Sequence, residues 1–165
     1  MTGDTLRDRA CETSANPAVS HLTDHLGYWL RVVSNHVSHA FAARVADRGI
    51  TVAEWVMLRA LYGRAPLSPS HLATEMGMTR GAISKLADRL EAKGLATRTA
   101  SVEDRRAHTL TLTAEGARLV PELAALADAN DAAFFGVLAP AERAELERLL
   151  RQLAERGRMS APPLD

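Results

Sequence analysis

Three adjoining segments decide the fold of this chain: SPSHLATEMG (68–77), TRGAISKLADRLEAKGLATRT (79–99) and ASVEDRRAHTLTL (100–112). Ser68 followed by Pro69 is typical of a helix start, because serine caps free amides and proline fits the first helical position. Gly77 is the kind of residue that ends a helix, so the first segment predicts a short helix. Thr79 and Gly94 have the same two roles in the second segment and predict a longer helix between them.

The third segment completes a hairpin. Residues 95–99 and 109–112 have alternating, β-prone side chains, and a polar loop separates them. Two short helices followed by a hairpin are the layout of a winged helix-turn-helix, in which the second helix enters a DNA groove. We therefore predict a mainly α fold with a winged helix-turn-helix lobe over about 51–112, whose wing has two or three strands.

The helix predicted over residues 79–93 has two faces. Its apolar residues fall within an arc of about 100° and are expected to face the core: Ile83, Leu86, Ala87 and Leu90. On the other side, small residues would let the backbone approach base edges, and Lys or Arg would reach guanine acceptors or phosphates. A solvated amphipathic helix that binds nothing is the alternative. The predicted DNA-facing residues are Gly81, Ala82, Ser84, Lys85, Asp88 and Arg89.

The hairpin tip favours the DNA interpretation. Two adjacent arginines, Arg105 and Arg106, are predicted at an exposed turn, where packing against the core would not stabilise their side chains. Arginine beside such a helix suits insertion into a minor groove or a clamp on phosphates. Asp104 would be repelled by DNA, so we assign it to positioning one of these arginines through an ion pair. Further predicted DNA contacts are Arg98 and the helix-start residues, whose free amides favour a phosphate: Ser68, Ser70, Thr79 and Arg80.

The charge distribution agrees with a DNA partner only locally. The 165-residue chain has 20 basic and 20 acidic residues, so its net charge is zero. Between residues 77 and 108, however, there are seven basic residues and four acidic ones. A phosphate backbone responds to charges within about one Debye length, roughly 8 Å, so this concentration counts for more than the total. With 47% apolar and 24% charged residues, the composition is that of an ordinary globular protein.

Helices are also predicted before the lobe and at its start. Residues 1–18 are polar and aperiodic, which indicates a disordered or loosely attached tail. Apolar residues spaced by three or four then predict a helix over 21–47. Thr51 with Glu54 forms a capping box that opens another helix, to about Tyr62.

Two further helices are predicted after the hairpin, over 113–137 and from Pro140 onward, with a kink or local break at Pro121. The flanking helices have more apolar surface than so small a lobe could cover, and a twofold dimer is the commonest solution. We therefore expect one domain over 19–157, with dimerisation helices over about 21–47 and 113–157 and a tail over 158–165. The apolar stripes are Leu22–Phe41, Phe134–Leu138 and Leu146–Leu153.

The chain resembles the MarR family of bacterial transcription regulators from about His21 to Glu155. The resemblance lies in GITVAEWVMLRAL (49–61), LATEMGMTRGAISKLADRLEAKGLATR (72–98) and EDRRAHTLTLTAEG (103–116), of which the last is the most specific. It implies a homodimer with interlocking terminal helices that binds a palindromic double-stranded operator. It also implies that helix 79–93 enters the major groove, while Arg105 or Arg106 reaches the adjacent minor groove.

The resemblance further implies a small-molecule site where the first helix meets the lobe, often for phenolic or other anionic aromatic compounds. Some members sense oxidation through a cysteine early in that helix. Here Gly27 stands at that position and the single cysteine, Cys11, lies in the tail, so we expect no such sensing. The residues that could line the ligand crevice are Tyr28, Trp29, Val32, His36 and Met57. For each of them the alternative is an ordinary packing role in the core.

Four histidines lie within an arc of about 60° on the predicted first helix: His21, His25, His36 and His39. Each neighbouring pair has a spacing that can hold a metal ion, so a metal-responsive regulator is one alternative. The two pairs are about 16 Å apart along the axis, however, and no cysteine or carboxylate completes either set. We interpret them as polar residues that flank a buried stripe.

Other function classes have less support. The sequence has no nucleophile–base pair, glycine-rich phosphate loop or usefully spaced carboxylates, so neither an enzyme nor a cofactor is predicted. A winged protein-interaction module is a second alternative, but the clustered cations favour DNA. No apolar run approaches the roughly 20 residues of a membrane span, and a cytoplasmic location is expected. The leading hypothesis is a dimeric transcription regulator, a repressor that a small ligand releases.

Overall fold

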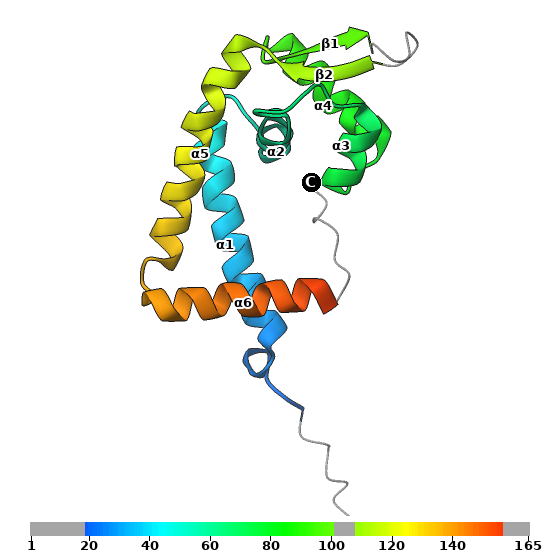
Figure 1. Cartoon of the computed structure of the whole chain (residues 1–165). Helices are drawn as coiled ribbons and strands as arrows, with labels where there is room; N and C mark the ends of the chain where they lie inside the picture. The colour runs from blue at the N-terminus through cyan, green and yellow to red at the C-terminus, as the bar shows by residue number, and fades with distance from the viewer. Residues whose placement is uncertain (1–18, 101–107, 157–165) are drawn as a thin grey trace, which may run out of the picture.

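The computed structural model describes residues 19–100 and 108–156 and contains the predicted elements in the predicted order (Figure 1). The fold is mostly helical with one antiparallel hairpin, as expected of a winged helix-turn-helix. The elements are a short 3-10 turn, η1 (Leu22–Asp24), followed by α1 (Leu26–Ala46), α2 (Val52–Leu61), α3 (Pro69–Met76), α4 (Arg80–Ala92), β1 (Ala96–Ala100), β2 (His108–Leu112), α5 (Ala114–Phe135) and α6 (Pro140–Arg156).

The predicted helix caps are confirmed. The Thr51 hydroxyl accepts from the Glu54 amide at 3.2 Å, and the Glu54 carboxylate accepts from the Thr51 amide at 2.8 Å. Ser68 caps α3 and Thr79 caps α4 through their hydroxyl groups. Gly77 ends α3 with φ of 65°, a left-handed conformation that glycine adopts without a steric penalty.

The core of the lobe lies where α2, α3, α4 and β2 meet. The apolar face of α4 is buried as predicted, and this face anchors the helix so that its opposite side remains in solvent. On the hairpin, Leu110 is also fully buried, and its amide and carbonyl pair with those of Leu67 at 2.8 and 3.0 Å. This bridge adds a short third segment beside β2, in agreement with the expected two- to three-stranded wing. The largest fully buried apolar side chains are those of Met57, Leu58, Leu72, Met76, Ile83, Leu86, Leu90, Leu110 and Leu123.

The start of α5 is fixed to the turn between α4 and β1. Thr113 donates from its hydroxyl to the Gly94 carbonyl at 2.7 Å and from its amide to the Leu95 carbonyl at 3.1 Å. Gly116 then passes so close to this turn that a Cβ on it would lie 2.0 Å from the Leu95 oxygen. The Thr-Ala-Glu-Gly sequence therefore couples α5 to the lobe, with glycine at the point of contact.

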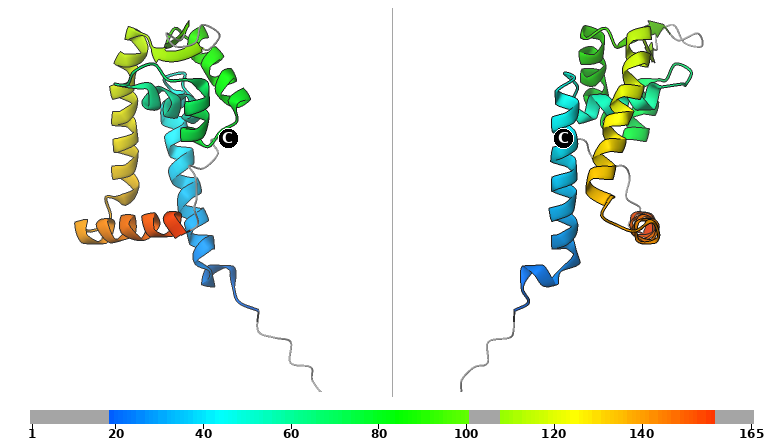
Figure 2. Two further views of the ribbon diagram at one scale, coloured as in Figure 1. Left: turned by 45° about the vertical axis from the view of Figure 1, so that its right-hand side comes forward. Right: turned by 90° about the vertical axis from the view of Figure 1, so that its left-hand side faces the viewer.

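The helices α1 and α5 run side by side away from the lobe (Figures 1 and 2). After α5 the chain turns, and α6 runs across the direction of α5, apart from α1 in the right-hand view of Figure 2. Asn130 of α5 is buried against α1 and donates from Nδ2 to the Val37 carbonyl at 3.2 Å. A kink or local break was expected at Pro121; the break is absent, because α5 continues through this residue as one helix. Pro121 is exposed, and buried packing of Val120 and Leu123 on the other face holds the helix together.

The prediction of one helix over 21–47 is wrong at its start. His25 has an extended backbone, with φ of −99° and ψ of 125°, and α1 begins only at Leu26. The preceding residues form the 3-10 turn instead, since the Asp24 carboxylate accepts from the His21 amide at 2.8 Å. Trp29 fixes this turn by donating from its ring to the Thr23 carbonyl at 2.9 Å.

The predicted apolar stripes are largely exposed in the single chain. Leu26 on α1 is 87% exposed and Leu153 on α6 is 57% exposed, and no residue of α6 is buried. Such surfaces on two long helices are unusual for a monomer. None of the helices described here is long and apolar enough to cross a membrane.

Candidate nucleic-acid interface

The exposed face of α4 is the centre of the candidate interface. Thr79 accepts from the Ala82 amide at 3.2 Å, which fixes the first turn of the helix. Among the described residues, no ion pair involves the cations Arg80 and Lys85 on this face. Their charges are therefore available to phosphates or base edges. The neighbouring exposed residues are Thr79, Gly81, Ser84 and Asp88, whereas Ala82 is half-buried.

The structure gives Arg98 and Asp88 a role within the protein. The Arg98 guanidinium on β1 lies 2.7 Å from the Asp88 carboxylate and also pairs with Glu91, both on α4. It donates to the Ser84 carbonyl at 3.1 Å as well. Two carboxylates thus neutralise Arg98 and fix the wing to α4. Arg98 and Asp88 thus have a structural role, and their predicted contact with DNA stays a prediction.

The remaining predicted DNA contacts lie on α3 and on the wing. Ser68 and Ser70 are exposed in the first turn of α3, and the Ser68 hydroxyl already accepts from the His71 amide at 3.2 Å. Asp104, Arg105 and Arg106 lie outside the described residues, so their predicted roles stay predictions.

The carboxylate of Glu54 is buried behind α4. The sequence predicted only the capping box with Thr51 for Glu54, and no functional role. Glu54 is 0% exposed, and its Oε2 accepts from Lys93 Nζ at 2.7 Å and from the Thr51 amide at 2.8 Å. Arg89 Nε lies 3.3 Å from the other oxygen, Oε1. Burial alone would raise the pKa of Glu54, but the hydrogen bonds from Lys93 and Thr51 outweigh it and lower the pKa below its ordinary value.

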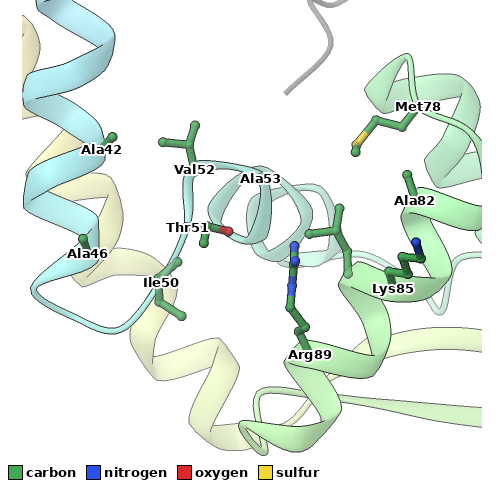
Figure 3. A pocket seen from close by; sticks show the side chains of 11 residues that line it. Ala42, Ala46, Ile50, Thr51, Val52, Ala53, Met78, Ala82, Lys85 and Arg89 are labelled. Carbon is green, nitrogen blue, oxygen red and sulfur yellow. The ribbon is translucent and has the colours of Figure 1, made fainter. Parts of the chain in front are cut away.

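A cleft of about 580 Å³ separates α4 from α1 and from the start of α2 (Figure 3). That volume is in the range of small-molecule sites. Its walls are largely apolar, while Lys85 and Arg89 of α4 extend toward it and supply positive charge. The apolar lining includes Ala42, Ala46, Ile50, Val52, Ala53, Met78, Ala82 and Leu86.

The residues predicted for a ligand site are not brought together in this cleft. Met57 is fully buried in the core of the lobe. Tyr28 and Trp29 pack edge to face on one another, with ring centroids 5.3 Å apart. Val32 is half-buried, and its carbonyl lies 2.9 Å from Nδ1 of the exposed His36. None of these five residues lines the cleft beside α4.

The histidines are arranged differently from the predicted stripe. His21 and His25 precede α1, so only His36 and His39 lie on that helix. The His25 ring pairs with the Ser20 hydroxyl at 3.1 Å. In the described ranges 19–100 and 108–156, no three His, Cys, Asp or Glu side chains gather where they could hold a metal ion.

A helix-turn-helix, a hairpin wing fixed to its second helix, and free cations on that helix together define a winged helix DNA-binding protein. A sequence model described as the MarR family matches residues 48–107. The chain is 33% identical to an HTH-type transcriptional repressor of Mycobacterium tuberculosis, over 78% of this chain and 92% of the relative. The chain belongs to the MarR family and is a DNA-binding transcription regulator, not an enzyme.

Two solved structures extend the comparison. BpsR of Bordetella bronchiseptica, described with regulation of its DNA binding by 6-hydroxynicotinic acid, is 28% identical with a TM-score of 0.73. The match covers 83% of this chain and 98% of BpsR. CouR of Rhodococcus jostii RHA1, solved with p-coumaroyl-CoA, is 26% identical with a TM-score of 0.70, over 82% of this chain and 96% of CouR.

Proposed function

We propose that this protein is a homodimeric repressor that binds a palindromic DNA operator and leaves it when a small organic anion binds beside α4. The observation that carries the DNA contact is the exposed start of α4, where Arg80 and Lys85 have no ion-pair partner among the described residues. The M. tuberculosis relative is named a transcriptional repressor, which supports repression rather than activation by this protein. We also propose a cytoplasmic location, because the proposed target is DNA.

The exposed apolar helices support a dimer. Leu26 and Leu30 on α1, and Leu149 and Leu153 on α6, are all more than two-fifths exposed in one chain. Burial of such side chains contributes roughly 1.5–3 kcal/mol each, so a second copy that covers them would be strongly favoured. A twofold axis would present two α4 helices to DNA, with half-sites about 10–10.5 base pairs apart.

In this arrangement α4 enters the major groove with its first half. Gly81 leaves room for the backbone to approach base edges, while Arg80 and Lys85 reach phosphates or guanine acceptors. We propose that Arg105 or Arg106 contacts the adjacent minor groove, as the sequence predicts.

The cleft beside α4 supports release by a small organic anion. A largely apolar cavity with two cations on one wall suits a compact ring or chain that bears a carboxylate. A ligand there would pair with Lys85 and so compete with DNA for the same charge. Regulation of BpsR by 6-hydroxynicotinic acid, an aromatic carboxylic acid, supports this ligand class.

A gel shift with the DNA upstream of the protein's own gene tests the DNA part. At about 100 mM salt we expect a complex with two chains per site and a lower affinity for shuffled DNA of the same composition. No binding at this salt concentration would instead favour the protein-interaction alternative, and equal affinity for both DNAs would refute recognition of an operator.

Benzoate and its neutral isostere benzamide test the ligand part. We expect benzoate to weaken operator binding and benzamide to have no effect at the same concentration, because only the carboxylate can pair with the cleft cations. Equal effects of the two compounds would contradict an anion site.

A further inference from the structure

The carboxylate of Glu54 is the one buried charge among the described residues that touches the recognition helix on two turns. Lys93 lies 2.7 Å from it and Arg89 3.3 Å from it, and both residues belong to the end of α4 or its cap. A fully buried charge is costly unless it is paired, so these contacts are required by the position of Glu54. Glu54 thereby connects the start of α2 to the second half of α4.

The two oxygens of this carboxylate are used differently. Oε2 is saturated by Lys93 and by the Thr51 amide, and Lys93 is held further by the Gly49 carbonyl at 2.7 Å. Oε1 is buried and has no hydrogen-bond partner among the described residues, although Arg89 Nε is close to it. Arg89 is therefore attracted by charge without an aligned hydrogen bond, and its side chain remains 53% exposed.

Arg89 also lies four residues after Lys85, about one helical turn, on the flank of α4 that faces α2. An arginine at this distance from a DNA-facing lysine could reach the next phosphate if nothing restrained it. A contact of that kind would strengthen binding to any sequence, because phosphates carry no base information.

We propose that Glu54 is a positioning residue for DNA recognition, which retains Arg89 against α2 and so withholds one cation from the phosphate backbone. The inference rests on the proposed DNA contact of α4. Glu54 limits sequence-independent affinity and leaves the discrimination of sites to the first half of the helix. It acts through Arg89 and does not touch DNA itself.

The variant Glu54→Gln tests this role, because glutamine keeps the shape and can still accept from the Thr51 amide. We expect the slope of log K against log salt on non-operator DNA to steepen by about 0.9 per protomer, the value of one added phosphate contact. At about 0.15 M salt this corresponds to roughly fivefold tighter non-operator binding per protomer. The ratio of operator to non-operator affinity should fall accordingly.

Glu122→Gln is the matched control. Glu122 is an exposed carboxylate on α5 that pairs with Arg48, so the substitution changes net charge equally but frees a cation that is not part of α4. Its salt slope should equal that of the wild type. A Glu54→Gln slope that matches this control would overturn the proposal, because a merely structural carboxylate changes melting temperature and leaves the slope unchanged.

The double variant Glu54→Gln/Arg89→Gln identifies the released cation. If Arg89 is that cation, the added slope disappears in the double variant; if the added slope persists, the proposal is wrong. Failure of the wild type to prefer operator DNA would refute the proposed function instead, so the two failures are distinguishable.

A measurement on the wild type covers the case in which Glu54→Gln does not fold. The NMR signal of the Arg89 Nε–H group, assigned by comparison with Arg89→Lys, should stay unchanged on addition of non-operator DNA, while that of Arg80 shifts. A matching shift at Arg89 would show that Glu54 does not restrain it and would overturn the proposal.

Discussion

Gly116→Ala should destabilise the protein although alanine is the better helix former. In an unobstructed helix the exchange stabilises by about 1 kcal/mol. Here the new Cβ would lie 2.0 Å from the Leu95 oxygen, so α5 has to move away from the turn that precedes β1. That movement breaks the two hydrogen bonds of Thr113 to Gly94 and Leu95, each of which contributes about 1 kcal/mol.

The strain of an overpacked site adds about 1–3 kcal/mol, so the expected net loss is roughly 2–4 kcal/mol. Urea unfolding followed by circular dichroism measures it. Gly81→Ala is the matched control, since it lies in the first turn of α4 with no atom nearer than 4.0 Å to its added Cβ. We expect Gly81→Ala to be neutral or slightly stabilising. If the two variants had equal stability, the close approach at Gly116 would be refuted as the reason for glycine there.

Other expected outcomes concern binding, assembly and pH. Lys85→Ala should weaken operator binding and reduce the salt slope by about 0.9 per protomer without loss of structure, as titrations at several salt concentrations would show. Arg105→Ala or Arg106→Ala should do the same, and unchanged affinity in both would contradict the wing assignment. Leu153→Glu should shift the protein toward monomers in light scattering, because it places a charge in the proposed interface. The pKa of Glu54 is lower in the folded protein than in the unfolded chain. Its contribution to stability is therefore present above the unfolded pKa and is lost as the pH falls through the folded pKa. Free energies of unfolding measured across acid pH should depend less on pH in Glu54→Gln than in the wild type.

Local signals in the sequence predicted most of the fold correctly. The capping box at Thr51, the Ser68-Pro69 start and the glycine at position 77 each act within about one helical turn, so they are visible without a structure. The error at the first helix has the same origin. Apolar spacing continues through Leu22, but the bond between the His21 amide and the Asp24 side chain favours a separate 3-10 turn.

The candidate site was predicted in part. The two faces of α4 follow from its periodicity, and the buried face agrees with the structure. Periodicity does not say which exposed charges are already neutralised, however. Arg98 is paired with Asp88, and Arg89 is close to Glu54, through contacts that join different elements. The cleft beside α4 likewise arises only when α1, α2 and α4 are placed together.

By itself, the sequence determined the order of the elements, the face of α4 that packs inward and the family to which the chain belongs, because caps, periodicity and motifs are properties of neighbouring residues. The tertiary structure decided which cations of α4 lie beside a carboxylate and which have no ion-pair partner among the described residues. Glu54 and Lys93 are 39 positions apart, and only folding buries the carboxylate between α2 and α4. Burial removes the water that would otherwise solvate that charge, and it is this loss that makes Glu54 attract the cations of the recognition helix.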